Sequence, residues 1–147
     1  MKIQIINGPN MDLLGVRQPE IYGHLRFEPF MEKLAKHYPQ VQIDFFQSNS
    51  EGSIIDKLHQ VGFNYDGIIL NGAAYSHYSI AIADAIASIK APVVEVHMTN
   101  IHARAEREPF REHSVTGSKC KAVIAGFGLI GYKLALESFV LPGEENI

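Results

Sequence analysis

Residues 66–97 read DGIILNGAAYSHYSIAIADAIASIKAPVVEVH, and this stretch decides the fold. Two short aliphatic runs, at 66–71 and 92–97, are typical of buried strands. Between them, the apolar residues of 79–90 recur at helical spacing. Because parallel strands need a crossover connection, usually a helix, the stretch predicts a strand, a helix and a second strand parallel to the first.

The same alternation extends along the rest of the chain. Further strands are predicted at 2–7, 41–46 and 121–126, and further helices at 27–38, 53–62 and 129–140. Five strands that alternate with helices indicate a parallel sheet covered on both faces, an αβα arrangement of three layers. Right-handed crossovers then favour the strand order 2-1-3-4-5 of a doubly wound, flavodoxin-like α/β fold. Ser48 and Glu51 have the spacing of a capping box for the helix at 53–62.

The composition limits the class of protein. With 46% hydrophobic and 20% charged residues, we expect residues 1–147 to form a single globular domain. A net charge of −3 argues against a nucleic-acid or membrane-surface partner, which usually goes with a basic excess. The lone Cys120 excludes an internal disulfide framework and fits a reducing compartment. Because no signal-peptide pattern and no apolar run near ~18 residues is present, we expect a soluble, cytoplasmic protein.

Polar residues stand where the predicted strands end, which is where open parallel sheets bind ligands. Glu95 and His97 lie two residues apart and therefore on the same face of their strand. A carboxylate beside an imidazole fixes its tautomer and favours its protonated form, so His97 is a candidate general acid. The alternative is a buried histidine that its neighbour satisfies. Asn10 and Asn71 stand at or just after the ends of two other strands.

A long loop after the first strand contains RQPEIYG at 17–23. We expect Pro19 and Gly23 to keep this segment from being helical and to form a loop that closes over a ligand. A free phenol has a pKa of about 10 and is a poor base at neutral pH. A guanidinium close by favours the phenolate, so Arg17 makes Tyr22 a candidate base opposite the imidazole. The alternative is that Tyr22 anchors the loop and Arg17 is a surface charge.

A second long loop, 98–119, is rich in cationic and titratable side chains: His102, Arg104, Arg107, Arg111 and His113. Such a segment suits an anionic ligand, because arginine binds carboxylates through two hydrogen bonds. The alternative is a solvated, charged loop. His77 is expected at the start of a helix, near backbone N–H groups that can bind oxygen atoms.

Cofactor and metal signals are weak. GFGLIG at 126–131 matches a dinucleotide-binding pattern, but it opens the last predicted helix, so we interpret its glycines as close packing of helix on sheet. His97 and His102 are five residues apart in a loop, and one cysteine cannot build a thiolate site. We therefore expect no metal and no cofactor.

Taken together, these residues resemble the type II 3-dehydroquinate dehydratases, or type II dehydroquinases, of the shikimate pathway. The stretches that carry the resemblance are NGPNMDLLGVRQPEIYG (7–23), FFQSNSEGSIID (45–56), LNGAAYSHYSIAIADA (70–85), PVVEVHMTNIHAR (92–104) and REPFREHS (107–114). The resemblance spans roughly residues 1–140 in the same motif order. It implies a flavodoxin-like fold and a lyase that converts 3-dehydroquinate to 3-dehydroshikimate and water by anti elimination through an enolate, without metal or Schiff base. The resemblance also implies that this step leads to chorismate and the aromatic amino acids.

The resemblance also implies roles for individual residues. Tyr22 would be the base that takes the proton next to the ketone, and Arg17 would keep it anionic. His97 would be the acid that protonates the departing hydroxyl, with support from Glu95. Asn10 would be associated with a water that stabilises the enolate oxygen.

Substrate contacts and assembly follow from the same resemblance. Asn71, His77 and Arg111 would bind substrate hydroxyls, and the backbone at Met98 and Thr99 would receive the substrate carboxylate. Asp84 would reach into the site of a neighbouring subunit, in a homo-oligomer that is typically a dodecamer of four trimers.

Three departures from the family pattern are present. Gly72 and Ala73 replace the Pro-Gly that usually follows Asn71, and Asp12 adds a negative charge near the first loop. Three extra residues in the second loop leave either Arg104 or Arg107 to act as the loop arginine.

A different class of function is a flavodoxin-like binding module that holds FMN, which would make the purified protein yellow. A phosphate-accepting receiver domain does not fit, because it needs an aspartate at the end of the third strand, where this chain has Asn71.

Overall fold

A parallel sheet of five strands forms the centre of the fold. The computed structural model describes residues 1–22 and 24–141. The strands are β1 (Lys2–Asn7), β2 (Gln42–Gln47), β3 (Gly67–Asn71), β4 (Val93–His97) and β5 (Ala122–Ala125). Their order is β2-β1-β3-β4-β5, and all of the pairings are parallel. The predicted strand order and fold class are therefore confirmed.

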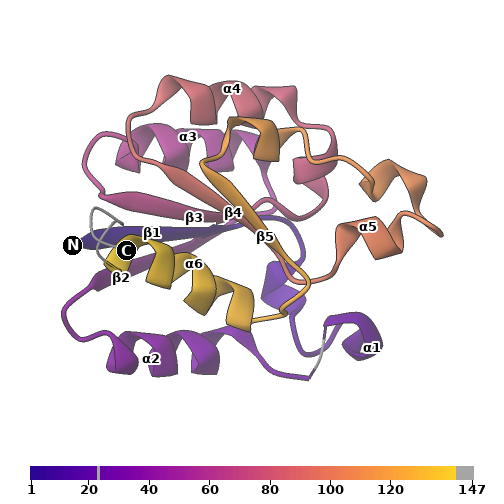
Figure 1. The fold of residues 1–147 in the computed structure, drawn as a ribbon, viewed down its shortest axis with the longest axis horizontal. Coiled ribbons are helices and arrows are strands. Elements are labelled where there is room, and N and C mark those ends of the chain that lie inside the picture. Colours follow the sequence, from indigo (N-terminus) through magenta and orange to yellow (C-terminus); the bar gives the residue numbers. More distant parts are fainter. Residues whose placement is uncertain (23, 142–147) are drawn as a thin grey trace.

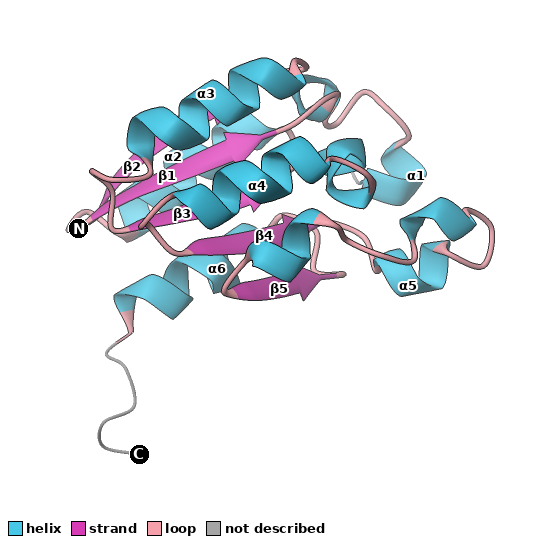
Figure 2. Cartoon of the chain, turned by 90° about the horizontal axis from the view of Figure 1, so that it is seen from above, coloured by secondary structure: helices cyan, strands magenta, loops and turns pink. Residues whose placement is uncertain are grey.

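Two pairs of helices cover the sheet (Figures 1 and 2). Helices α3 (Glu51–Val61) and α4 (Ile80–Ser88) lie on one face, and α2 (Phe27–His37) and α6 (Ile130–Val140) lie on the other. All of them were predicted, with no end shifted by more than two residues. No helix within residues 1–22 and 24–141 has both the length and the apolar character that crossing a membrane requires.

The two long connections contain short helical turns. The first holds η1 (Met11–Leu13) and α1 (Pro19–Tyr22). The second holds α5 (Ile101–Arg104), η3 (Pro109–Arg111) and η4 (Thr116–Lys119), and η2 (Ala73–His77) follows β3. Helices α1 and α5 lie beyond the same end of the sheet (Figures 1 and 2). This is the end at which a ligand site was expected.

The core consists of two apolar clusters, one on each face of the sheet. Residues on the two faces of β1 belong to different clusters: Ile3 and Ile5 pack with α2 and α6, and Ile6 packs with α3 and α4. Every residue of β3 and β4 is buried, as expected for strands covered on both faces. These buried strands hold their carboxyl ends in fixed positions.

The predicted capping box at the start of α3 is wrong. The helix begins at Glu51, two residues before the predicted start, so Ser50 becomes its N-cap and accepts a hydrogen bond from the Ser53 N–H. The Ser48 hydroxyl accepts instead from the Ser50 N–H. A helix that begins at Glu51 has its N-cap at the preceding residue, so Ser48 lies two residues too early to cap it.

The expectation that RQPEIYG is non-helical is also wrong for its central residues. Pro19 is the first residue of α1, and the N–H groups of Ile21 and Tyr22 both donate to the Gln18 carbonyl. Proline is tolerated at a first helical position, because its missing N–H would have no partner there. Gly23, the other residue expected to prevent a helix, lies outside the described residues.

The glycine-rich segment before α6 packs closely against the sheet, as interpreted from the sequence. A Cβ atom on Gly131 would lie 3.0 Å from the Cγ1 of Val96 on β4. Gly126 has a φ of 95°, which side chains rarely adopt, so this glycine turns the chain from β5 toward the helix.

Candidate active site

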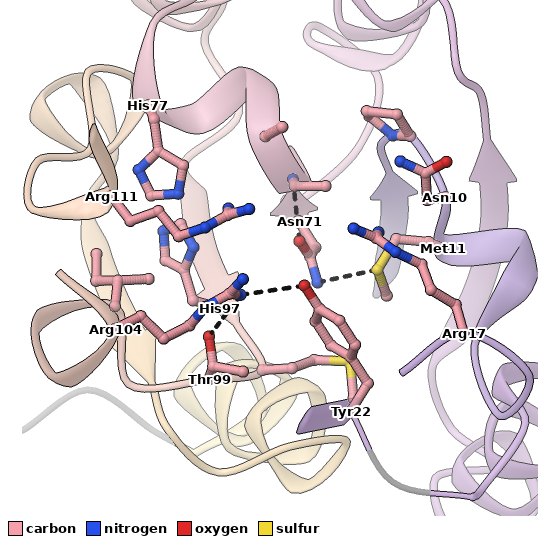
Figure 3. Close-up of a pocket in the computed structure, with 15 residues that line it drawn as sticks. Asn10, Met11, Arg17, Tyr22, Asn71, His77, His97, Thr99, Arg104 and Arg111 are labelled. Carbon is pink, nitrogen blue, oxygen red and sulfur yellow. Dashed lines mark hydrogen bonds between the residues drawn. The ribbon is translucent and has the colours of Figure 1, made fainter. Parts of the chain in front are cut away.

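A cavity opens beyond the carboxyl ends of β1, β3 and β4 (Figure 3). Its volume is about 530 Å³ when the open mouth is included. Its lining residues come from both long connections and from the strand ends: Pro9, Asn10, Met11, Arg17, Tyr22, Asn71, Ala73, Ala74, His77, His97, Met98, Thr99, Ile101, Arg104 and Arg111. The predicted site residues Asn10, Arg17, Tyr22, Asn71, His77, His97, Met98, Thr99, Arg104 and Arg111 are all among them.

Glu95 and His97 form a buried pair at the end of β4. The Nε2 atom of His97 donates to Oε1 of Glu95 at 2.5 Å, as the same-face spacing predicts. Burial alone would raise the pKa of Glu95, but hydrogen bonds from His97, Ser114 and Thr116 outweigh it and hold that pKa below its usual value. Because Nε2 is taken by Glu95, Nδ1 is the ring nitrogen that His97 can offer to a ligand.

Tyr22 enters the cavity from α1, on the side opposite His77 and His97 (Figure 3). The Arg17 guanidinium lies 5.4 Å from the centre of the Tyr22 ring, and that of Arg104 lies 5.7 Å from it. Nη1 of Arg104 donates to the Tyr22 hydroxyl at 3.0 Å. Arg17 therefore contacts the ring face, whereas Arg104 binds the oxygen. Sequence reasoning did not anticipate this second contact.

The two arginines left open by the sequence lie in different places. Arg104 lines the cavity and also donates to Thr99 Oγ1 at 3.4 Å. Arg107 does not line this cavity but lines a neighbouring hollow, to which Arg104 also contributes. The Glu108 carboxylate joins Arg104 to Arg111, at 2.8 Å and 2.7 Å. Glu108 thereby fixes two cavity cations relative to each other.

His77 lies at the end of η2 rather than at the start of the following helix, which begins at Ile80. Its Nδ1 atom lies 2.8 Å from the carbonyl oxygen of His113 and donates to it, which leaves Nε2 as an acceptor. Burial lowers the pKa of His77, and His97 and Arg111 contribute to the same shift. His77 is thus set up as a neutral hydrogen-bond acceptor beside His97, with ring centres 5.8 Å apart.

The floor of the cavity rests on a buried residue that sequence reasoning missed. Tyr132 of α6 donates its hydroxyl to Asn7 Oδ1 at 2.7 Å and accepts from Asn71 Nδ2 at 2.8 Å. Burial raises the pKa of Tyr132, so the hydroxyl stays protonated. Oδ1 of Asn71 accepts from the Ala73 N–H at 3.1 Å. An aromatic residue in an apolar helix suggests only core packing, and no local signal marked its hydroxyl.

Removal of the Tyr132 hydroxyl should destabilise the protein. We expect Tyr132→Phe to lower the free energy of unfolding by about 1–3 kcal/mol, because two buried amide groups lose a hydrogen-bond partner. Urea unfolding followed by circular dichroism measures the change. The matched control is Tyr78→Phe on an exposed ring, with a change under about 0.5 kcal/mol. Equal losses in the two variants would contradict the prediction.

Asp84 is exposed on α4 and does not line the cavity of its own chain. Within residues 1–22 and 24–141, no three side chains of His, Cys, Asp or Glu lie close enough together to hold a metal ion.

Comparisons with known proteins agree with one another. The family model described as "Dehydroquinase class II" matches residues 1–140. A 3-dehydroquinate dehydratase of Clostridium botulinum is 51% identical over 149 residues, which cover 99% of this chain and 96% of the relative. One from an Exiguobacterium species is 48% identical over 141 residues, or 95% of this chain and 94% of the relative. The crystal structure of a type II dehydroquinase from Butyrivibrio crossotus has a TM-score of 0.90 at 42% identity and covers 96% of this chain and 98% of its own.

Proposed function

This chain belongs to the class II dehydroquinase family, and we propose that its cavity performs the family's reaction with Tyr22 as the base and His97 as the acid. The reaction converts 3-dehydroquinate to 3-dehydroshikimate and water, a step of the shikimate pathway. The observation that carries the assignment is the placement of Tyr22 and His97 on opposite sides of one cavity (Figure 3). Anti elimination needs this arrangement, because the proton and the hydroxyl leave from opposite faces. The FMN-binding alternative is not favoured by the relatives.

Each step of the elimination has a suitable group. The Tyr22 oxygen takes the proton from the carbon next to the ketone, and the C–H electron pair moves to form the enolate. The enolate then expels the hydroxyl group, which takes a proton from Nδ1 of His97 and leaves as water. Glu95 stabilises the imidazolium that this requires. Proton transfers of this kind contribute about 10²–10⁴ each to the rate.

Two arginines lie beside the proposed base, Tyr22. In this proposal Arg17, which lies over the ring, keeps Tyr22 anionic, and Arg104 donates a hydrogen bond to its oxygen. Arg104, rather than Arg107, is the loop arginine, because Arg104 contacts Tyr22 and lines the cavity. Asn10 binds a water that stabilises the enolate oxygen.

Polar groups that line the cavity bind the substrate. Asn71, His77 and Arg111 bind its hydroxyl groups, and the backbone at Met98 and Thr99 receives its carboxylate. Residues 1–147 act as a single catalytic domain in the cytoplasm. Asp84 contributes to the site of a neighbouring subunit in a dodecamer of four trimers, a role that is supported by its exposed position on α4.

A direct assay tests the function. We expect the purified protein to convert 3-dehydroquinate to a product with the ultraviolet absorbance of a conjugated enone, and to remain colourless itself. A spectrophotometer follows both properties on the same sample. Absence of enone formation from an intact, folded preparation would overturn the assignment, and a yellow protein would favour the FMN-binding alternative.

A further inference from the structure

Residues 113–116 follow the arginines of the second loop. They contact His77 directly and His97 through its partner Glu95. The His113 carbonyl accepts from His77, and the hydroxyls of Ser114 and Thr116 both donate to Glu95. We propose that Ser114 and Thr116 are positioning residues that keep Glu95 ionised and aimed at His97. This inference deepens the proposed function and rests on the role of His97 as the acid.

Both oxygens of the Glu95 carboxylate accept hydrogen bonds. Oε1 of Glu95 accepts from His97 Nε2 and from the Ser114 hydroxyl, while Oε2 accepts from the Thr116 hydroxyl. Glu95 and Thr116 are both fully buried. An ionised carboxylate removed from water is strongly unfavourable unless hydrogen bonds replace the lost hydration. The two hydroxyls supply that replacement without adding a charge.

The charge on Glu95 matters because it decides what His97 can donate. An ionised Glu95 only accepts hydrogen bonds, so His97 must direct its Nε2 proton at it and is stabilised as the imidazolium. A protonated Glu95 would no longer stabilise that positive charge. Without its charge, Glu95 would give no electrostatic support to the proton transfer from His97 to the departing hydroxyl.

A backbone contact to Ser76 and a turn around the Ser114 hydroxyl hold the segment beside Glu95. The Val115 N–H donates to the Ser76 carbonyl at 2.7 Å, and the Gly117 N–H donates to the Ser114 hydroxyl at 3.0 Å. A Cβ atom on Gly117 would lie 3.0 Å from that hydroxyl and 3.1 Å from Glu95 Oε1. Glycine at this position therefore lets η4 approach the carboxylate closely enough for both hydroxyls to reach it.

The other groups that face Glu95 do not replace the hydroxyls. His97 on β4 is itself the hydrogen-bond partner of the Glu95 carboxylate. His77 on η2 has its pKa lowered, chiefly by burial, which favours its neutral form. Cys120, after η4, has its pKa raised to about 12 by burial and by the charge of Glu95, so its thiol does not ionise near neutrality. The positive charge of Arg111 lowers the pKa of His77. Loss of the hydroxyls should therefore be seen directly in the ionisation of Glu95.

The test uses Ser114→Ala and Thr116→Val, which remove one hydroxyl each and change the side-chain volume little. We expect kcat at neutral pH to fall about tenfold in each, the usual effect of one hydrogen bond to a charged group. The acid limb of the kcat profile should move to higher pH, because Glu95 then protonates more readily. KM should change by less than about twofold, since neither hydroxyl lines the cavity. Thr116→Ser, which keeps the hydroxyl, should restore the wild-type profile.

The matched control is Ser118→Ala, whose hydroxyl lies in the same turn but donates to the Val115 carbonyl. This variant should keep the wild-type pH profile. Difference infrared spectra against a Glu95→Gln reference follow the carboxyl stretch of Glu95 and need no activity. We expect protonation at higher pH in Ser114→Ala and Thr116→Val.

Unchanged infrared titration in folded Ser114→Ala or Thr116→Val would overturn the inference, even if kcat fell. If Thr116→Val does not fold, Ser114→Ala alone decides between the two results. A wild-type protein that forms no enone, while the infrared titration shifts as expected, would overturn the proposed function and leave the ionisation of Glu95 explained.

Discussion

Replacement of Tyr22 by phenylalanine is expected to remove nearly all dehydration while the fold remains intact. The change deletes one oxygen atom, which is the atom proposed to take the proton from carbon. The ring remains, so its contacts with the Arg17 and Arg104 guanidinium groups can persist. We expect kcat to fall by about 10²–10⁴, the contribution of a positioned proton transfer. Steady-state measurement of enone formation gives kcat and KM.

The control for this variant is Tyr78→Phe, which removes a hydroxyl from an exposed ring outside the cavity. It should keep kcat within about twofold of the wild type, as surface substitutions usually do. Circular dichroism and thermal unfolding should show that Tyr22→Phe is folded, because Tyr22 is only partly buried. Near-normal turnover in Tyr22→Phe would show that another group is the base.

The sheet could be predicted from sequence because its signal is local and repeated. Aliphatic runs at 66–71 and 92–97 correspond to β3 and β4, which are buried along their whole lengths. The period of two in a strand also placed Glu95 and His97 side by side, and the structure confirms their contact. Both successes depend on residues that lie next to one another in the chain.

The missed features depend on residues far apart in the chain. Arg104 and Tyr22 are separated by 82 positions, and Tyr132 and Asn7 by 125. Local periodicity says which face a side chain occupies, but not which loops meet beyond the end of the sheet. For the same reason, the sequence left Arg104 and Arg107 as alternatives, whereas the turn of α5 brings only Arg104 to the cavity.

The errors at helix ends have a different cause. The cap of α3 and the helical turn at Pro19 depend on hydrogen bonds of single N–H groups, such as those of Ser53 and Tyr22. Several nearby residues could supply such caps, so composition alone does not choose among them. For Tyr22 the difference matters, because α1 sets the direction from which the phenol enters the cavity (Figure 3).

Replacement of His97 by alanine should also abolish elimination, but at a later step than Tyr22→Phe. The leaving hydroxyl needs a proton, and within the described residues His97 is the cavity imidazole paired with a carboxylate. We expect kcat to fall by about 10²–10⁴. Because His97 is buried against Glu95, the variant also leaves that carboxylate without one of its hydrogen-bond donors. The double variant Glu95→Gln/His97→Ala removes the unpaired buried charge and so isolates the loss of acid catalysis.

Exchange in deuterated water distinguishes the two steps. If Tyr22 still forms the enolate, His97→Ala should incorporate deuterium next to the substrate ketone faster than Tyr22→Phe does, although neither variant eliminates water. Proton NMR of 3-dehydroquinate follows this exchange. Persistent elimination in His97→Ala would assign the acid to another residue. An enolate that forms but cannot expel hydroxide must return to the ketone, and it then takes up deuterium. Exchange as slow as that of Tyr22→Phe would therefore mean that His97 takes part in removing the carbon-bound proton.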